Sequence, residues 1–76
     1  MAKKPFNGHE SWTAWNVSLW INNDEGLYRE AQRLAQKHGI ERGARHMAAN
    51  LAGERTPDGA RYSFNTIRLA MREILS

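Results

Sequence analysis

The stretch WNVSLWINNDEGLY, residues 15–28, joins a nearly continuous apolar run to a polar break. At about 100° per residue, Trp15 and Leu19 fall on one side of a helix and Ile21 falls nearly opposite them. A helix that is apolar almost all round is normally a buried one. We therefore predict a buried helix over residues 11–21, followed at once by a second helix.

Residues typical of helix ends stand on both sides of these two helices. Ser11 is a good N-cap for the first helix. Asn22 or Asn23 is expected to accept the free backbone N–H groups at the start of the second helix, over residues 24–38. Gly39 then supplies a left-handed C-terminal stop.

Two weaker helices are predicted in the rest of the chain. Apolar residues at spacings of 3 and 4 predict a third helix over residues 41–52, which Gly43 weakens by about 1 kcal/mol relative to Ala. The fourth is expected over residues 65–75, with Asn65 as its cap. Between them, Thr-Pro-Asp-Gly at residues 56–59 predicts a turn, because Pro fixes φ at the second position and Gly suits the last.

These elements predict an all-α fold, a compact single-domain bundle of about four short helices. The domain is expected to span residues 11–76, preceded by a flexible N-terminal segment at residues 1–10. Large apolar side chains from the first two helices are expected to supply most of the core, because a chain this short needs dense burial. The predicted core residues are Trp12, Trp15, Leu19, Trp20, Leu27 and Leu34.

Length and composition exclude several classes of protein. The chain has 76 residues, which allow one domain, and no Cys, which excludes disulfides and thiolate metal sites. No stretch approaches the ~20 apolar residues of a membrane span, and the start lacks the apolar run of a signal peptide. A net charge of +3 permits nucleic-acid or acidic-protein partners without requiring either. We expect a cytoplasmic protein that does not bind membranes.

No arrangement of residues typical of catalysis is visible in the sequence. His9, His38 and His46 lack the spacing of a helical metal site. The acidic stretch at residues 23–26 does not fit a calcium loop, because Ile21 would stand at the first ligand position. The Ser residues have no identifiable base. We therefore expect no enzymatic activity, no cofactor and no bound metal.

Arginines are the candidate partner-binding residues. They either form an ordinary solvated surface, contact phosphates, or supply the polar rim of a protein interface. A helix-turn-helix is compatible with the junction at Gly39, but the third helix carries few side chains suited to base edges. The candidates are Arg42, Arg45, Arg55, Arg61, Arg68 and Arg72.

Two motifs resemble a known family. SWTAWNVSLWINNDEGLY, residues 11–28, resembles the pattern T-W-N-V-x-L-W-I-x-N-D-E-x-L-Y of small uncharacterised proteins from phages, prophages and plasmids. Thr-Pro-Asp-Gly at residues 56–59 is similar to a second motif of that family, also followed by a terminal helix. The Arg-rich and Ala-rich segment at residues 40–55 matches no pattern of the family. The resemblance implies a mobile-element origin and brings no established activity or catalytic residues.

Small phage-encoded domains without catalytic residues commonly bind and block a host protein, and this analogy sets our functional expectation. We expect a non-enzymatic phage or mobile-element protein that inhibits or redirects a protein or ribonucleoprotein complex in the cytoplasm of its bacterial host. Anti-defence activity, for example anti-CRISPR, or host takeover would be its role. The alternative is a small basic DNA- or RNA-binding regulator that uses the same arginines on phosphates.

Overall fold

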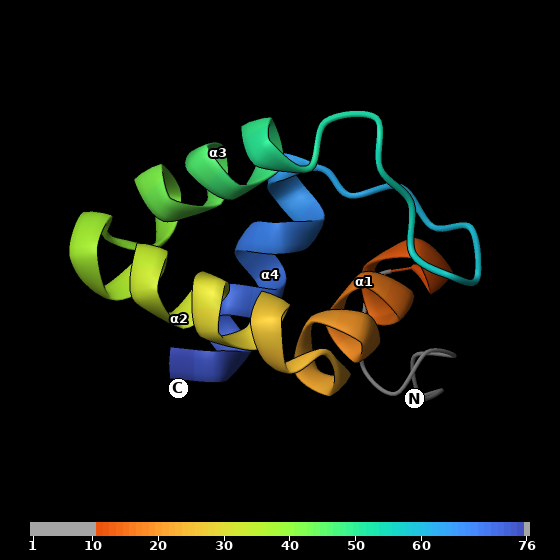
Figure 1. Cartoon of the computed structure of the whole chain (residues 1–76), viewed down its shortest axis with the longest axis horizontal. Helices are drawn as coiled ribbons and strands as arrows, with labels where there is room; N and C mark the ends of the chain where they lie inside the picture. Colours follow the sequence, from red (N-terminus) through yellow and green to blue (C-terminus); the bar gives the residue numbers. More distant parts are fainter. Residues whose placement is uncertain (1–10, 76) are drawn as a thin grey trace, which may run out of the picture.

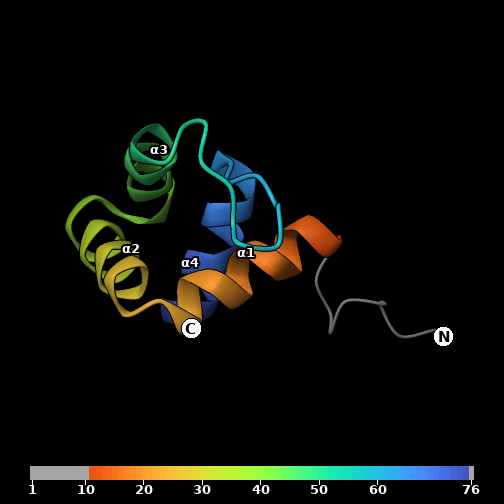
Figure 2. The same cartoon turned by 45° about the vertical axis from the view of Figure 1, so that its right-hand side comes forward.

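Four helices and their connections make up the structure, a computed structural model that describes residues 11–75. The predicted all-α fold is confirmed, whereas the predicted flexible segment at residues 1–10 lies outside the described residues, as does residue 76. The helices are α1 (Trp12–Asn23), α2 (Glu25–His38), α3 (Ile40–Asn50) and α4 (Phe64–Leu75). In Figure 1, α2 and α3 form a hairpin, and the connection from α3 to α4 arches back over α1. Figure 2 shows the same arrangement from the side, with α4 packed against each of the other three helices.

Side-chain caps fix the first two helix starts. Ser11 caps α1 as predicted, since its Oγ accepts a backbone N–H of the first turn at 3.1 Å. Asp24, rather than Asn22 or Asn23, caps α2, because its Oδ1 accepts the Leu27 N–H at 3.0 Å. Asp24 is itself extended, and α1 therefore continues two residues beyond its predicted end before the chain turns.

The start of α4 also differs from the prediction. Ser63 Oγ accepts the Thr66 N–H at 3.2 Å, and Thr66 Oγ1 accepts the Ser63 N–H at 3.0 Å. This reciprocal pair is a capping box with Thr in place of the usual Glu or Gln. Asn65, the predicted cap, instead accepts a hydrogen bond from Arg68. The helix consequently begins at Phe64, one residue earlier than expected.

Close backbone approach holds the hairpin of α2 and α3 together. Gly39 ends α2 with a positive φ of 85°, as predicted, but its ψ of 162° lies outside the left-handed helical region that was expected. A Cβ atom at Gly43 would lie 2.8 Å from the backbone oxygen of Leu34. Gly43 therefore does more than weaken α3, because its missing side chain allows the two backbones to touch.

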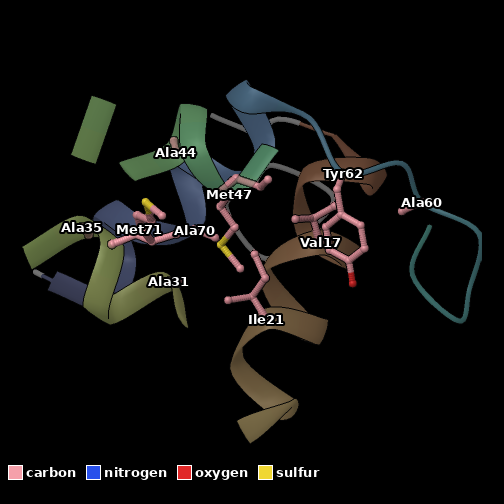
Figure 3. Close-up of a cluster of buried hydrophobic side chains, with 12 residues drawn as sticks. Val17, Ile21, Ala31, Ala35, Ala44, Met47, Ala60, Tyr62, Ala70 and Met71 are labelled. Atoms are coloured by element: carbon pink, nitrogen blue, oxygen red, sulfur yellow. The ribbon is translucent and has the colours of Figure 1, made fainter. Parts of the chain in front are cut away.

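The core fills the space between the four helices. It contains both small residues, chiefly Ala, and large apolar side chains. Figure 3 shows Met47 of α3 pointing toward Ile21 of α1. Tyr62, from the connection before α4, lies beside Val17 in the same view. The largest fully buried apolar side chains are Ile21, Met47, Ile67, Met71 and Val17.

Trp12 and Trp15 of α1 lie away from the side of the helix that is buried in the core. The buried apolar residues of α1 are Ala14, Val17 and Ile21. Trp12, predicted as core, is 39% exposed, and Trp15 and Leu19 are half-buried outside the core cluster. The prediction of a helix buried all round is wrong, because among residues 11–75 only one side of α1 faces the core, and Trp12 on the other side is exposed.

The remaining predicted core residues divide between the core and its edge. Leu34 is buried, and Leu27 is partly buried against the core cluster. Trp20 is half-buried under the connection before α4 rather than between helices.

Among the helices of residues 11–75, none has the length and apolar character needed to span a membrane.

Candidate functional site

The two sequence motifs meet in the structure and bond to each other. Asn16 of α1 is buried, and its Nδ2 donates a hydrogen bond of 2.9 Å to Asp58 Oδ2. Its Oδ1 accepts a hydrogen bond of 2.5 Å from the Thr56 hydroxyl. Trp20 Nε1 donates to the same Asp58 oxygen at 2.9 Å. The predicted turn is thereby attached to α1 from two sides; we call these four side chains the motif network.

The geometry of the turn completes the motif network. Thr56 Oγ1 also accepts the Ala60 N–H at 3.0 Å, and Gly59 adopts φ at 97°, as the last position of the predicted turn requires. The hydrogen bond from Asn16, and then that from Trp20, lower the pKa of Asp58 below its ordinary value of 3.8. Every buried side-chain nitrogen and oxygen among the described residues has a partner. The motif network is therefore a fold-stabilising feature, with its polar groups already committed.

The six candidate arginines lie in three separate places. Arg42 and Arg45 are exposed on α3. On α4, Arg68 is half-buried and Arg72 is exposed. Arg55 and Arg61 are exposed and face each other in a single antiparallel backbone bridge within the connection before α4. The structure therefore does not unite all six in one surface.

Ion pairing separates these arginines from the others of the chain. Arg29 pairs with Glu25 at 3.6 Å, and Arg33 pairs with Glu30 at 2.9 Å, both on the surface of α2. None of the six candidates is within ion-pair distance of a carboxylate belonging to residues 11–75. Their charges are consequently available to an outside partner.

Arg45 and Arg68 approach the ring of Phe64 from two different helices. The guanidinium carbon of Arg45 lies 5.0 Å from the ring centroid and that of Arg68 lies 5.9 Å from it, both within the ~6 Å range of a cation–π contact. Arg68 is oriented further by the 2.9 Å hydrogen bond that its Nη2 donates to Asn65 Oδ1. We call Arg45, Phe64 and Arg68 the arginine–phenylalanine site. It presents two oriented cations beside a half-buried apolar ring, which suits an anionic group next to an apolar one.

A second group of basic residues lies where α3 meets α2. The rings of His38 and His46 are stacked, with centroids 4.5 Å apart and planes inclined by 24°. Partial desolvation, and then the charges of His46, Lys37, Arg33 and Arg42, lower the pKa of His38 below 6.5. Arg45 therefore contacts α4, and the next residue, His46, contacts α2. The exposed side of α3 consequently has basic residues along both edges.

Sequence reasoning identified the arginines but not their neighbours. Neither Phe64 nor the stacking of His38 on His46 was predicted. One signal was available for Phe64, because it stands four residues before Arg68 and side chains at that spacing meet on a helix. Nothing in the spacing of Arg45 placed it on the same ring. Among the described residues, no group of three His, Cys, Asp or Glu side chains is arranged to hold a metal ion.

Comparison with known proteins places the chain in a family. A family model described as "Family of unknown function (DUF7249)" matches residues 2–76, so the chain belongs to this family. No curated protein matches it, and no solved structure does. The predicted membership of an uncharacterised family is confirmed, and it assigns no activity to the arginine–phenylalanine site.

Proposed function

We propose that this chain is a non-enzymatic protein of a phage or other mobile element, which binds a host protein complex and inhibits or redirects it. Anti-defence activity, such as inhibition of a CRISPR effector, is the most specific form of the proposal. The mobile-element origin rests on the resemblance of residues 11–28 and 56–59 to the phage, prophage and plasmid pattern. The binding role rests on the geometry of α3 and α4.

The observation that carries the proposal is the arginine–phenylalanine site. Two guanidinium groups from separate helices lie within 5.9 Å of one ring centroid, and no carboxylate of residues 11–75 neutralises them. Arginines held against an aromatic ring lose little further side-chain freedom when they bind. Protein interfaces are enriched in such aromatic and Arg residues, which account for most of the measured binding energy.

The distribution of charge favours a protein partner over nucleic acid. The net charge is only +3, and the six candidate arginines occupy three places rather than one continuous groove. Nucleic-acid binding draws most of its affinity from many phosphate contacts made together. A protein partner requires only a local acidic group beside an apolar contact, and this is what Arg45, Phe64 and Arg68 match.

A DNA- or RNA-binding regulator is the second candidate function. The specific observation in its favour is the exposed side of α3, where Arg42, Arg45 and His46 stand together on the second helix of a hairpin. In helix-turn-helix proteins the second helix enters the major groove. The two candidates differ in their response to salt, since phosphate binding weakens steeply as the salt concentration rises.

Affinity capture from a bacterial lysate tests the proposal. The tagged protein is compared with Arg45→Glu/Arg68→Glu, and with Arg29→Glu/Arg61→Glu as a control that changes the charge equally outside the arginine–phenylalanine site. We expect the unchanged protein and the control to retain the same host protein after nuclease treatment. The site variant should lose it, because two central interface residues at ~2 kcal/mol each correspond to a loss of affinity of about a thousandfold.

Circular dichroism confirms that both variants fold, since Arg45 is exposed and Arg68 only half-buried. Undiminished capture by Arg45→Glu/Arg68→Glu would reject the site. Retention that disappears with nuclease, together with a steep log–log dependence of affinity on salt, would replace the proposal by the second candidate.

A further inference from the structure

The stacked rings of His38 and His46 lie outside the arginine–phenylalanine site, and the proposed function does not use them. They join the C-terminal end of α2 to the middle of α3, with ring centroids 4.5 Å apart. His38 is half-buried, whereas His46 is exposed. Their contact is therefore partly open to solvent and accessible to a small ligand.

The charged groups around this ring pair are almost all positive. From α2, Arg33 and Lys37 act on His38, and from α3, Arg42 and His46 do so. Among residues 11–75, no carboxylate acts on His38, and Glu30 of α2 is held by Arg33 through hydrogen bonds of 2.9 and 3.3 Å.

On α3, one acidic and one basic residue flank this cluster. Glu41 is exposed and makes no ion pair with a described residue, and Arg45 is directed to Phe64. Positive charge is consequently concentrated at the ring pair, with little compensation from the protein itself.

Protonation of His38 is opposed by its surroundings. A proton on His38 places an imidazolium against the ring of His46, beside Lys37 and Arg42. Like charges at this distance repel, and a bound anion would reverse the sign of that interaction. Imidazolium, guanidinium and ammonium groups are all hydrogen-bond donors, and tetrahedral oxyanions offer acceptors in several directions.

We infer that Lys37, His38, Arg42 and His46 form a second binding site, for a doubly charged oxyanion of the phosphate class, and that binding is coupled to uptake of a proton by His38. This site is independent of the proposed function, because it needs no protein partner and uses none of the arginine–phenylalanine residues. Free phosphate and the terminal phosphate of a nucleotide share the chemistry that it recognises. A phosphodiester, with a single charge and two blocked oxygens, should bind poorly.

Titration with small anions, followed by NMR of the backbone amides, tests this site on the whole chain. Sulfate is the first probe, since it stays doubly charged across the pH range, so that any pH dependence belongs to the protein. Ionic strength is held constant with sodium chloride. We expect the affinity for sulfate to rise as the pH falls from about 7.5 to about 5.5, by up to about tenfold per pH unit for one proton taken up. The shifted amides should cluster in residues 33–46.

Further arms of the titration identify the source of the phosphate. Inorganic phosphate and adenosine monophosphate should bind, whereas a dinucleotide without a terminal phosphate should not. Binding of inorganic phosphate alone would mark free phosphate as the ligand. Equal binding of the dinucleotide would overturn the assignment to doubly charged anions.

Matched variants separate a site from general attraction by a basic protein. Lys37→Gln/Arg42→Gln should weaken sulfate binding about tenfold at both pH values, while Arg29→Gln/Arg61→Gln, with the same loss of charge, should leave it unchanged. His38→Gln should abolish the pH dependence. Three results would each overturn the inference. They are equal weakening of sulfate binding by both double variants, a sulfate affinity of the unchanged protein that does not depend on pH, and amide chemical-shift changes spread over the whole surface. The double variants replace exposed side chains and are expected to fold like the unchanged protein, so a loss of sulfate binding would not be caused by unfolding.

Discussion

Replacement of Asn16 by Ala tests the role that the structure gives to the two sequence motifs. Asn16 is 1% exposed and is the only described residue that bonds to both Thr56 and Asp58. The variant removes both hydrogen bonds without introducing a larger side chain. We expect the connection before α4 to lose its attachment to α1 at this point, while Trp20 alone still donates to Asp58.

The expected loss of stability follows from these contacts. Asp58 is exposed, so water replaces the hydrogen bond that Asn16 donates to its carboxylate, and the loss of this bond adds little. The Thr56 hydroxyl, on a residue that is 3% exposed, loses its acceptor, which costs about 1–3 kcal/mol more. Ala favours the helix over Asn by about 0.5 kcal/mol, which offsets a small part. The net destabilisation is about 0.5–2.5 kcal/mol, a substantial fraction of the ~5–15 kcal/mol that stabilises a typical domain.

Urea unfolding, followed by circular dichroism and by Trp fluorescence, measures this loss. At about 4–8 °C per kcal/mol for a domain of this size, a loss of about 1.5 kcal/mol should lower the midpoint of thermal unfolding by about 6–12 °C. Asn23→Ala is the matched control, because Asn23 is an exposed residue of the same helix and should change the stability by less than about 0.5 kcal/mol. A change for Asn16→Ala as small as that of the control would refute the reasoning.

Three further predictions concern stability and use the same urea assay. Gly43→Ala should destabilise the domain by about 1–3 kcal/mol, because the new Cβ would lie 2.8 Å from the Leu34 oxygen; a gain in stability from helix propensity would contradict this. Trp12→Ala should cost less than about 1 kcal/mol, since the side chain is 39% exposed; a loss of several kcal/mol would restore Trp12 to the core. The pKa of His38 is lowered in the folded state, so the unfolded chain binds this proton more readily, and the stability that His38 contributes is complete above about pH 6.5 and declines as the pH falls below it. His38→Gln should reduce this loss of stability at low pH. A urea midpoint of the unchanged protein that rises as the pH falls would show that the predicted direction is wrong.

Local sequence signals predicted the number and type of the helices. Contacts between residues that are far apart in the chain could not be predicted from the sequence. Ser11, Gly39 and the turn at residues 56–59 act within a few residues, so their chemistry is readable from the chain alone. On α1, both sides are apolar, and periodicity cannot say which of two apolar sides meets the other helices. The larger Trp side chains favoured the wrong side, and the structure buries the smaller residues instead.

Two residues that looked unfavourable locally prove to be necessary in three dimensions. Asn16 is a polar residue within the apolar run of the first helix, and its partners are 40 and 42 residues away along the chain, so its role could not be predicted from nearby residues. Gly43 seemed only to weaken α3, because the backbone of Leu34 that it contacts belongs to another helix. In the same way, the arginines were evident from composition, but the ring that brings Arg45 and Arg68 together was not.

Photo-crosslinking from position 64 tests most directly the claim that the arginine–phenylalanine site contacts a host protein. Phe64 is replaced by its benzoyl derivative in a protein produced in the bacterial host, and the same probe is placed at Trp12, on the far side of α1 from the core, as the comparison. On irradiation, we expect one discrete protein adduct from position 64 and none from position 12. An adduct from position 12 with none from position 64, or an adduct from position 64 that contains nucleic acid, would contradict it.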